Sequence, residues 1–161
     1  GAAYAYFRTK EEIQYELLAG VLNDLTRQLR SALSTMPINE PAQAPFILFL
    51  KYFRNHPQEK QLLLFVLPDL GATAQKIPDH VRTVLNGRLL ALMGLLANGL
   101  HQSGHSSATI AQEETIDFIA YLLGLLMLEN GGRLELLNQH PQEMVDRYGK
   151  RMLLRRDTKQ E

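Results

Sequence analysis

Residues 9–35, TKEEIQYELLAGVLNDLTRQLRSALST, carry the clearest structural pattern in the chain. Apolar residues recur three and four positions apart, which is the spacing of an amphipathic helix and not of a strand. Thr9 is suited to cap the first turn with its hydroxyl, and Glu12 follows three residues later, as in a capping box. The stretch predicts one long helix that ends at Met36-Pro37. Its buried side is predicted to carry a row of every fourth residue, widened by Leu18 and Leu22; the row is Ile13, Leu17, Val21, Leu25, Leu29 and Leu33.

The same helical spacing continues through the rest of the chain. Further helices are predicted over 45–55, 58–67, 78–102 and 109–130 and from Pro141 onward, with Gly104 closing the fourth of the six. Residues 133–138 are predicted to be a connector, with a short turn of helix as the alternative. The expected fold class is therefore all-α, a bundle of about six helices. Because the segment from Phe118 to Leu128 is apolar all round, we expect it to be buried on two sides, by its own core and by a second chain.

Composition places the chain among globular proteins. It has 161 residues, of which 45% are hydrophobic and 21% charged, as is typical of one folded domain. Lys plus Arg and Asp plus Glu number 17 each, so the chain lacks the basic surplus of a domain that grips DNA unaided. With no cysteine, no signal-peptide pattern and no apolar run long enough to span a bilayer, we expect a cytoplasmic protein without membrane contact.

Catalytic and metal-binding patterns are missing from the sequence. It contains no Gly-x-Ser-x-Gly, P-loop, His-Glu-x-x-His or Glu-x-x-His, which argues against a helix-bundle enzyme. His101 and His105 are four residues apart, but the predicted helix ends between them and no third ligand is near in sequence. We predict a protein that is not an enzyme and has no cofactor and no metal.

The first twelve residues, GAAYAYFRTKEE, combine a small residue, two closely spaced aromatics, Phe7, a Thr cap and Lys-Glu. This pattern resembles the exit of the helix-turn-helix in TetR-family transcriptional regulators. The resemblance implies that residues 1–8 are the end of a DNA-binding domain and residues 9–161 a ligand-binding and dimerisation domain. It also implies that Tyr4 and Tyr6 face DNA, that Lys10 meets a phosphate and that Phe7 packs inward. From the residues alone, Tyr4, Tyr6 and Phe7 are equally consistent with a hydrophobic staple.

The family further implies two reader helices before Gly1, without which this stretch is not expected to bind operator DNA with normal strength. It also implies an effector pocket among the middle helices. Their apolar and aromatic side chains suit a small hydrophobic or aromatic effector, although the same residues equally suit an ordinary core. The predicted ligand residues are Phe49, Tyr52, Phe53, Phe65, Met93, Leu96, Phe118, Tyr121 and Leu122, with Asn98 and His101 as polar anchors.

A homodimer interface is predicted on the last two long helices. One side of the 109–130 helix offers small and apolar residues, and the final helix offers a matching side, so that two subunits would form a four-helix bundle. Packing of the same residues within one chain is the alternative. The predicted interface residues are Ala120, Gly124, Met127, Leu128, Met144, Tyr148 and Met152.

Together these features predict a ligand-responsive transcriptional regulator of the TetR type, in its usual form a repressor. Its partners would be operator DNA, the effector and a second copy of the chain. Effector binding would change the affinity for operator DNA allosterically. The alternative is a TetR-like helical protein that binds a lipid or isoprenoid and does not bind DNA.

Overall fold

The computed structural model describes residues 8–37, 39–68, 77–104 and 106–157. The only regular secondary structure in these residues is helical, which confirms the predicted all-α class. The elements are α1 Lys10–Thr35, α2 Ala44–Asn55, α3 Pro57–Val66, α4 Asp79–Gln102, α5 Ala108–Asn130, α6 Arg133–Leu136 and α7 Pro141–Asp157. The short helix α6 occupies part of the predicted connector. At the end of α4, Gly104 has φ of +75°, which fits its predicted role in ending that helix.

The start of α1 has the predicted cap. Thr9 is in extended conformation, and its Oγ1 accepts a hydrogen bond of 3.1 Å from the backbone N–H of Glu12. This bond satisfies one of the backbone donors that a helix leaves unpaired in its first turn. Met36 returns to extended backbone just before Pro37 and ends the helix. The sequence therefore determines both ends of α1 locally.

The predicted buried side of α1 is wrong in its first half. Ile13 is 42% exposed and Leu17 is 56% exposed. At 3.6 residues per turn, a step of four residues advances about 40° beyond a full turn, so a strict every-fourth-residue row winds around the helix. The side chains that are actually buried form two adjacent rows with steps of three and four residues: Glu12, Tyr15, Leu18, Ala19, Leu22, Leu25, Thr26 and Leu29.

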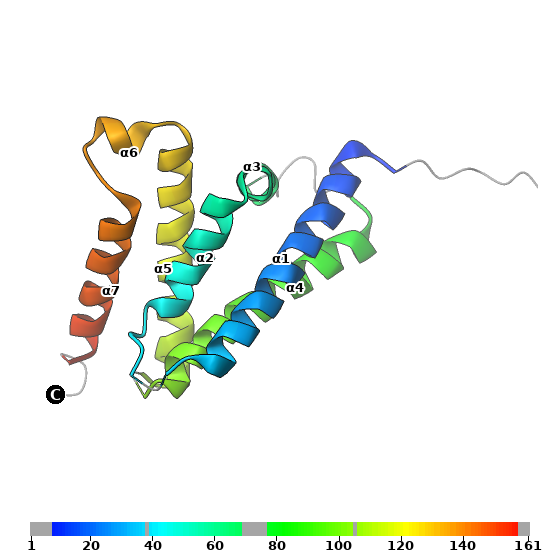
Figure 1. Cartoon of the computed structure of the whole chain (residues 1–161). Helices are drawn as coiled ribbons and strands as arrows, with labels where there is room; N and C mark the ends of the chain where they lie inside the picture. The colour runs from blue at the N-terminus through cyan, green and yellow to red at the C-terminus, as the bar shows by residue number, and fades with distance from the viewer. Residues whose placement is uncertain (1–7, 38, 69–76, 105, 158–161) are drawn as a thin grey trace, which may run out of the picture.

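Helices α1 and α4 lie side by side and run in the same direction (Figure 1). Near the middle of α1, Arg88 donates a hydrogen bond of 2.9 Å to Asn23, and near its end Leu33 lies beside Gly99. Helix α4 also packs on α5, so it lies between two long helices. Its buried side chains are all aliphatic: Val81, Leu85, Leu92, Leu96, Ala97 and Leu100.

Aromatic side chains connect the remaining layers. Phe46 of α2 stacks on Phe118 of α5 with ring centroids 4.2 Å apart, and both rings are fully buried. Phe118 also stacks on Tyr148 of α7 at 4.5 Å. Such pairs add to the free energy gained by burying their area. The core thus passes from the aliphatic α1–α4 contact to an aromatic contact between α2, α5 and α7.

Helix α7 lies beside α5, on the opposite side of the bundle from α1 (Figure 1). Arg155 donates two hydrogen bonds to the Glu114 carboxylate, at 2.7 and 3.3 Å, and its guanidinium lies 5.4 Å from the Tyr148 ring centroid. The hydrogen bonds to Glu114 raise the pKa of Arg155 further above its ordinary value, so Arg155 is charged at any physiological pH. At Gly149 a Cβ atom would lie 3.0 Å from the Gln43 side chain, so glycine permits the close approach of α7 to the start of α2.

One helix in the described part of the chain, α4, is long and apolar enough to cross a membrane by length and composition, with a window of mean hydropathy 1.3. A central helix of a soluble bundle has the same properties. The absence of membrane contact and the cytoplasmic location remain predictions.

Candidate functional site

Most of the predicted ligand residues are packed in the core. Phe49, Phe53, Leu96, Phe118 and Leu122 are each at most 2% exposed. Phe49 and Phe53 contact each other edge to face at 5.0 Å. These side chains fill space, which corresponds to the core alternative that the sequence left open.

The other predicted ligand residues are at the margin of the core or outside it. Tyr52, Met93 and Tyr121 are partly buried against the core, whereas Phe65 is 62% exposed on α3. Asn98 and His101 are exposed, and a ring nitrogen of His101 lies 2.8 Å from the backbone oxygen of Ser106. The exposure of Phe65 and the local bond of His101 argue against a shared pocket for the whole set.

A groove of about 470 Å³ lies where α1 and α4 both end. We call it the foot groove. Its walls come from the last turns of α1, the connection to α2, and the last turns of α4. Asn98 is the one predicted ligand residue among its lining residues: Arg30, Leu33, Ser34, Met36, Pro37, Glu40, Pro41, Ala42, Pro45, Leu95, Asn98, Gly99, Gln102 and Ser103.

No pattern in the sequence points directly to the foot groove. Ser34, Glu40 and Gln102 look like ordinary polar surface residues, and they come together only because α1 and α4 are parallel and end at the same level. In the sequence, α2 and α3 lie between α1 and α4. Helical periodicity predicts each helix but does not say that α1 and α4 pack in parallel.

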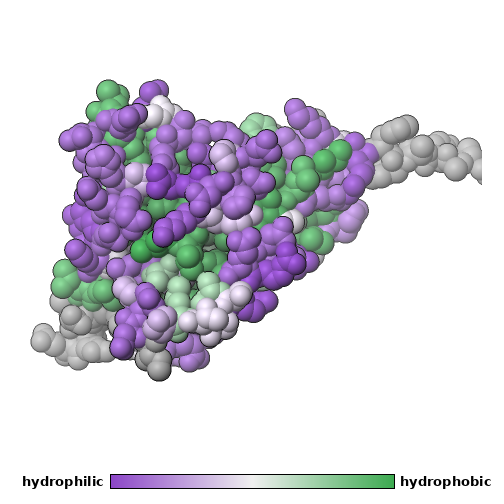
Figure 2. Space-filling view, in the orientation of Figure 1, coloured by the Kyte–Doolittle hydropathy of each residue, from purple (hydrophilic) through white to green (hydrophobic). Residues whose placement is uncertain are grey.

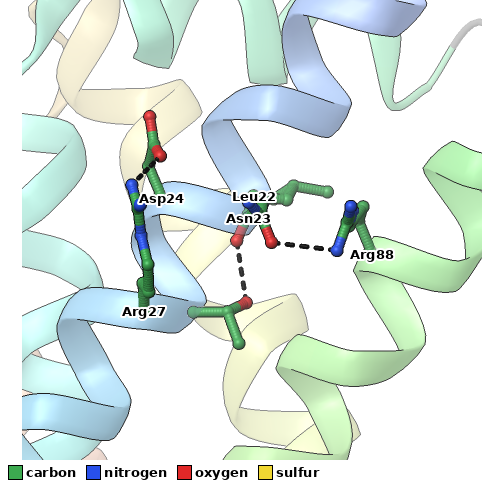
Figure 3. Close-up of polar contacts among 6 residues, drawn as sticks. Leu22, Asn23, Asp24, Arg27 and Arg88 are labelled. Atoms are coloured by element: carbon green, nitrogen blue, oxygen red, sulfur yellow. Dashed lines mark hydrogen bonds and ion pairs between the residues drawn. The ribbon is translucent and has the colours of Figure 1, made fainter.

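A second cavity, of about 280 Å³, lies between the first halves of α1 and α4. Two of its lining residues, Arg88 of α4 and Asn23 of α1, form a hydrogen bond, which Figure 3 shows beside the pair of Asp24 with Arg27. Its remaining lining residues are Glu16, Ala19, Gly20, His80, Val81 and Val84. Several polar side chains of this cavity already have partners, since Glu16 forms an ion pair with Arg8 and Asn23 accepts the hydrogen bond of Arg88.

The predicted dimer residues divide between the two helices. On α5, Ala120, Gly124, Met127 and Leu128 are exposed, with Met127 at 57%. On α7, Met152 is fully buried, so its predicted place in an interface is wrong. Tyr148 stacks on Phe118, and the backbone oxygen of Met144 accepts a hydrogen bond of 3.3 Å from the Tyr121 hydroxyl. Here α7 uses its apolar side within its own chain, because α5 offers it aromatic partners.

An uncovered apolar strip remains on α5 after α7 has packed. We define the α5 strip as Ile116, Ala120, Leu123, Gly124 and Met127, which are spaced three and four residues apart. Ile116 is 59% exposed and Leu123 is partly buried. Only one side of α5 therefore meets its own chain, which leaves the predicted second side available.

The predicted DNA-contacting residues lie at the start of the chain. Tyr4 and Tyr6 are outside the described residues, as is Phe7. Lys10 is exposed in the first turn of α1. Figure 2 shows apolar surface over the first half of α1, where Ile13 and Leu17 are exposed, and Val84 of α4 is 51% exposed.

No group of three metal-ligating side chains forms among the described residues. The chain from Arg8 to Asp157 is thus defined, within its described ranges, as an all-helical bundle with a mixed polar and apolar groove at one end and an uncovered apolar strip on α5. No protein-family model, curated protein or solved structure matches the chain at a significant level. The TetR resemblance accordingly rests on residues 1–12 and on the order of the helices.

Proposed function

We propose that this chain is the sensor and dimerisation part of a ligand-responsive transcriptional regulator of the TetR type. The observation that carries the proposal is the start of α1. A Thr9 cap joins the reader-like stretch directly to a helix of 26 residues, so a movement of that helix would be passed to whatever precedes it. Lys10 is exposed in the first turn, where unpaired backbone donors favour an anion such as a DNA phosphate.

Exposed apolar side chains at the same end support the proposal. Ile13 and Leu17 are neighbours on α1, and Val84 is exposed on the first half of α4. A group of large apolar side chains on a bundle surface marks a contact with another structural unit. A DNA-reading domain that precedes α1 would cover this surface and would fix its orientation relative to the sensor.

Selection of DNA by the natural protein with its complete N-terminal region tests the proposal. Random duplexes would be incubated with the protein, and the bound fraction sequenced over several rounds. We expect an inverted repeat whose half-sites are about one helical turn, or a multiple of it, apart. Lys10→Glu should weaken this binding. Lys150→Glu, at an exposed position of α7, should not weaken it. No enrichment of any duplex, together with a co-purified lipid, would favour the lipid-binding alternative.

The α5 strip supports the proposed homodimer. Gly124→Arg places a charged side chain in the strip without disturbing the subunit, because an added Cβ would meet nothing within 4 Å. Gly87→Arg on α4 is the matched control, since Gly87 is also an exposed helical glycine with open space around it. Sedimentation at micromolar concentration should show a dimer for the parent and for Gly87→Arg, and a monomer for Gly124→Arg. A monomeric parent protein would overturn the dimer.

A further inference from the structure

We infer that the foot groove is a binding site for a small, uncharged, mainly apolar molecule. This inference deepens the proposed function, because it names the location and the chemical class of the effector. Its regulatory meaning rests on that function, whereas the binding itself does not require DNA and is tested without it.

The size and composition of the foot groove suit such a molecule. Its volume of about 470 Å³ lies within the range of small-molecule sites, which is roughly 300–1,000 Å³. Ala42 and Pro45 are buried, so they form a fixed apolar floor between the two helix ends. Leu33, Met36 and Leu95 add apolar walls. This arrangement would remove much of the apolar surface of a bound molecule from water.

The electrostatics of the foot groove disfavour an anion. Arg30 and Glu40 contribute one charge of each sign, and neither has an ion-pair partner among the described residues. Helices α1 and α4 both present their carboxyl ends here, each with a partial negative charge, while α2 presents its amino end, whose partial positive charge offsets one of them. The last turn of α1 contains no basic residue that would offset this charge. Arg30 thus offsets only the charge of Glu40, which leaves no surplus positive charge for a carboxylate or sulfonate.

Two amide side chains provide the polar recognition. Asn98 and Gln102 are four residues apart on α4, so they lie on one side of the helix, and both are exposed. Neither side chain has a hydrogen-bond partner among the described residues. The hydroxyls of Ser34 and Ser103, in contrast, each donate to a backbone oxygen of their own helix at 2.7 Å. The amides are therefore the groups available to a ligand with one or two hydrogen-bonding atoms.

A matched pair of dyes tests the ligand class. N-phenyl-1-naphthylamine is uncharged and has one N–H donor, and its 8-sulfonate derivative differs only by the added anionic group. Both fluoresce more strongly in apolar surroundings. We expect saturable binding of the uncharged dye at one site per chain, and binding of the sulfonate at least roughly five-fold weaker because the groove has no surplus positive charge. Equal or stronger binding of the sulfonate would overturn the proposed class.

Two variants with matched controls test the location. Ser34→Tyr places a large side chain in the groove from an exposed position of α1 and should abolish binding of the uncharged dye. Ser31→Tyr, one turn earlier and outside the groove, should leave binding unchanged. Asn98→Ala should weaken binding roughly five-fold, as expected for one lost hydrogen bond. Asn86→Ala, at another exposed position of α4, should have no effect. Asn98→Ala makes the smaller change and decides the matter if Ser34→Tyr is misfolded by circular dichroism.

Failure of this inference is separable from failure of the proposed function. Dye binding that is unchanged by both Ser34→Tyr and Asn98→Ala would place the dye elsewhere, such as on the α5 strip, and would overturn the groove as the site. Absence of saturable binding would do the same. Neither result alters DNA selection by the natural protein, which tests the regulator itself.

Discussion

Helices α4 and α7 are attached to the bundle by different kinds of contact. Helix α4 buries Leu85, Leu92 and Leu96 to 3% exposure or less, against helices on two sides. Helix α7 packs on one side, where the buried Val145 and Met152 are joined by the stacked ring of Tyr148 and by the ion pair of Arg155 with Glu114. One bundle thus contains a helix held by aliphatic burial on two sides and a helix with less apolar burial, to which ring stacking and an ion pair are added.

This difference predicts two levels of stability within one fold. Apolar burial depends little on salt or pH, whereas a partly exposed ion pair is screened by salt. Elements with few buried apolar contacts open at lower free energy than the core. We therefore expect α7 to open before α4, and the following experiments test that order.

The largest effect is expected at the centre of α4. Leu96→Ala removes a fully buried side chain and should lower the free energy of unfolding by about 2–5 kcal/mol, measured by urea denaturation. Leu90→Ala, on the same helix but 72% exposed, should change it by less than about 0.5 kcal/mol. Similar losses in the two variants would contradict the assignment of α4 as the central helix.

The next effect is expected at the contact of α7. Glu114→Gln removes the charge from a carboxylate that is 10% exposed, while Arg155 remains 46% exposed and hydrated. Because of that hydration we expect a loss of only about 1–2 kcal/mol. Hydrogen exchange should accelerate in α7 and stay unchanged in α4. Glu113→Gln, at the exposed neighbouring position, is the control. If hydrogen exchange in α7 is unchanged or slower in Glu114→Gln, the ion pair does not hold α7 on the bundle.

A smaller effect is expected from alkali. Burial raises the pKa of the Tyr148 hydroxyl above its ordinary value of 10.0, and Arg155 opposes this only in part. Above about pH 10 the unfolded chain then loses this proton more readily than the folded chain, so stability falls as pH rises. In Tyr148→Phe, which keeps the stacked ring, the fall should be shallower. Identical pH profiles of unfolding in the two proteins would contradict the protected hydroxyl.

The smallest effect is expected from the polar contact between α1 and α4. Arg88→Ala removes the exposed hydrogen bond to Asn23 and should cost less than about 1 kcal/mol, because water replaces the lost partner. Arg82→Ala, at an exposed pair within α4 itself, serves as the control. A loss as large as that of Leu96→Ala would mean that the α1–α4 contact depends on polar groups, which would remove the contrast with α7.

The sequence predicted local structure well and tertiary arrangement poorly. The Thr9 cap and the turn at Gly104 are properties of a few adjacent residues, and both were predicted correctly. Ile13 and Leu17 were placed on the wrong side because a fourth-residue row was treated as straight. Met152 was assigned to an interface because its apolar spacing does not say which neighbour it will meet. The foot groove was missed, apart from Asn98, because it depends on two distant helices ending together.

The parallel course of α1 and α4 has a geometric consequence. At a rise of about 1.5 Å per residue, the 26 residues of α1 extend about 39 Å from the foot groove to Lys10. A wedge at the groove that rotated the helix by about 5° would displace its far end by about 3 Å, close to the rise of one base pair. Because α4 runs beside α1 along this length, it would keep α1 straight. A small displacement at the foot groove would then produce a larger displacement of the N-terminal end of α1.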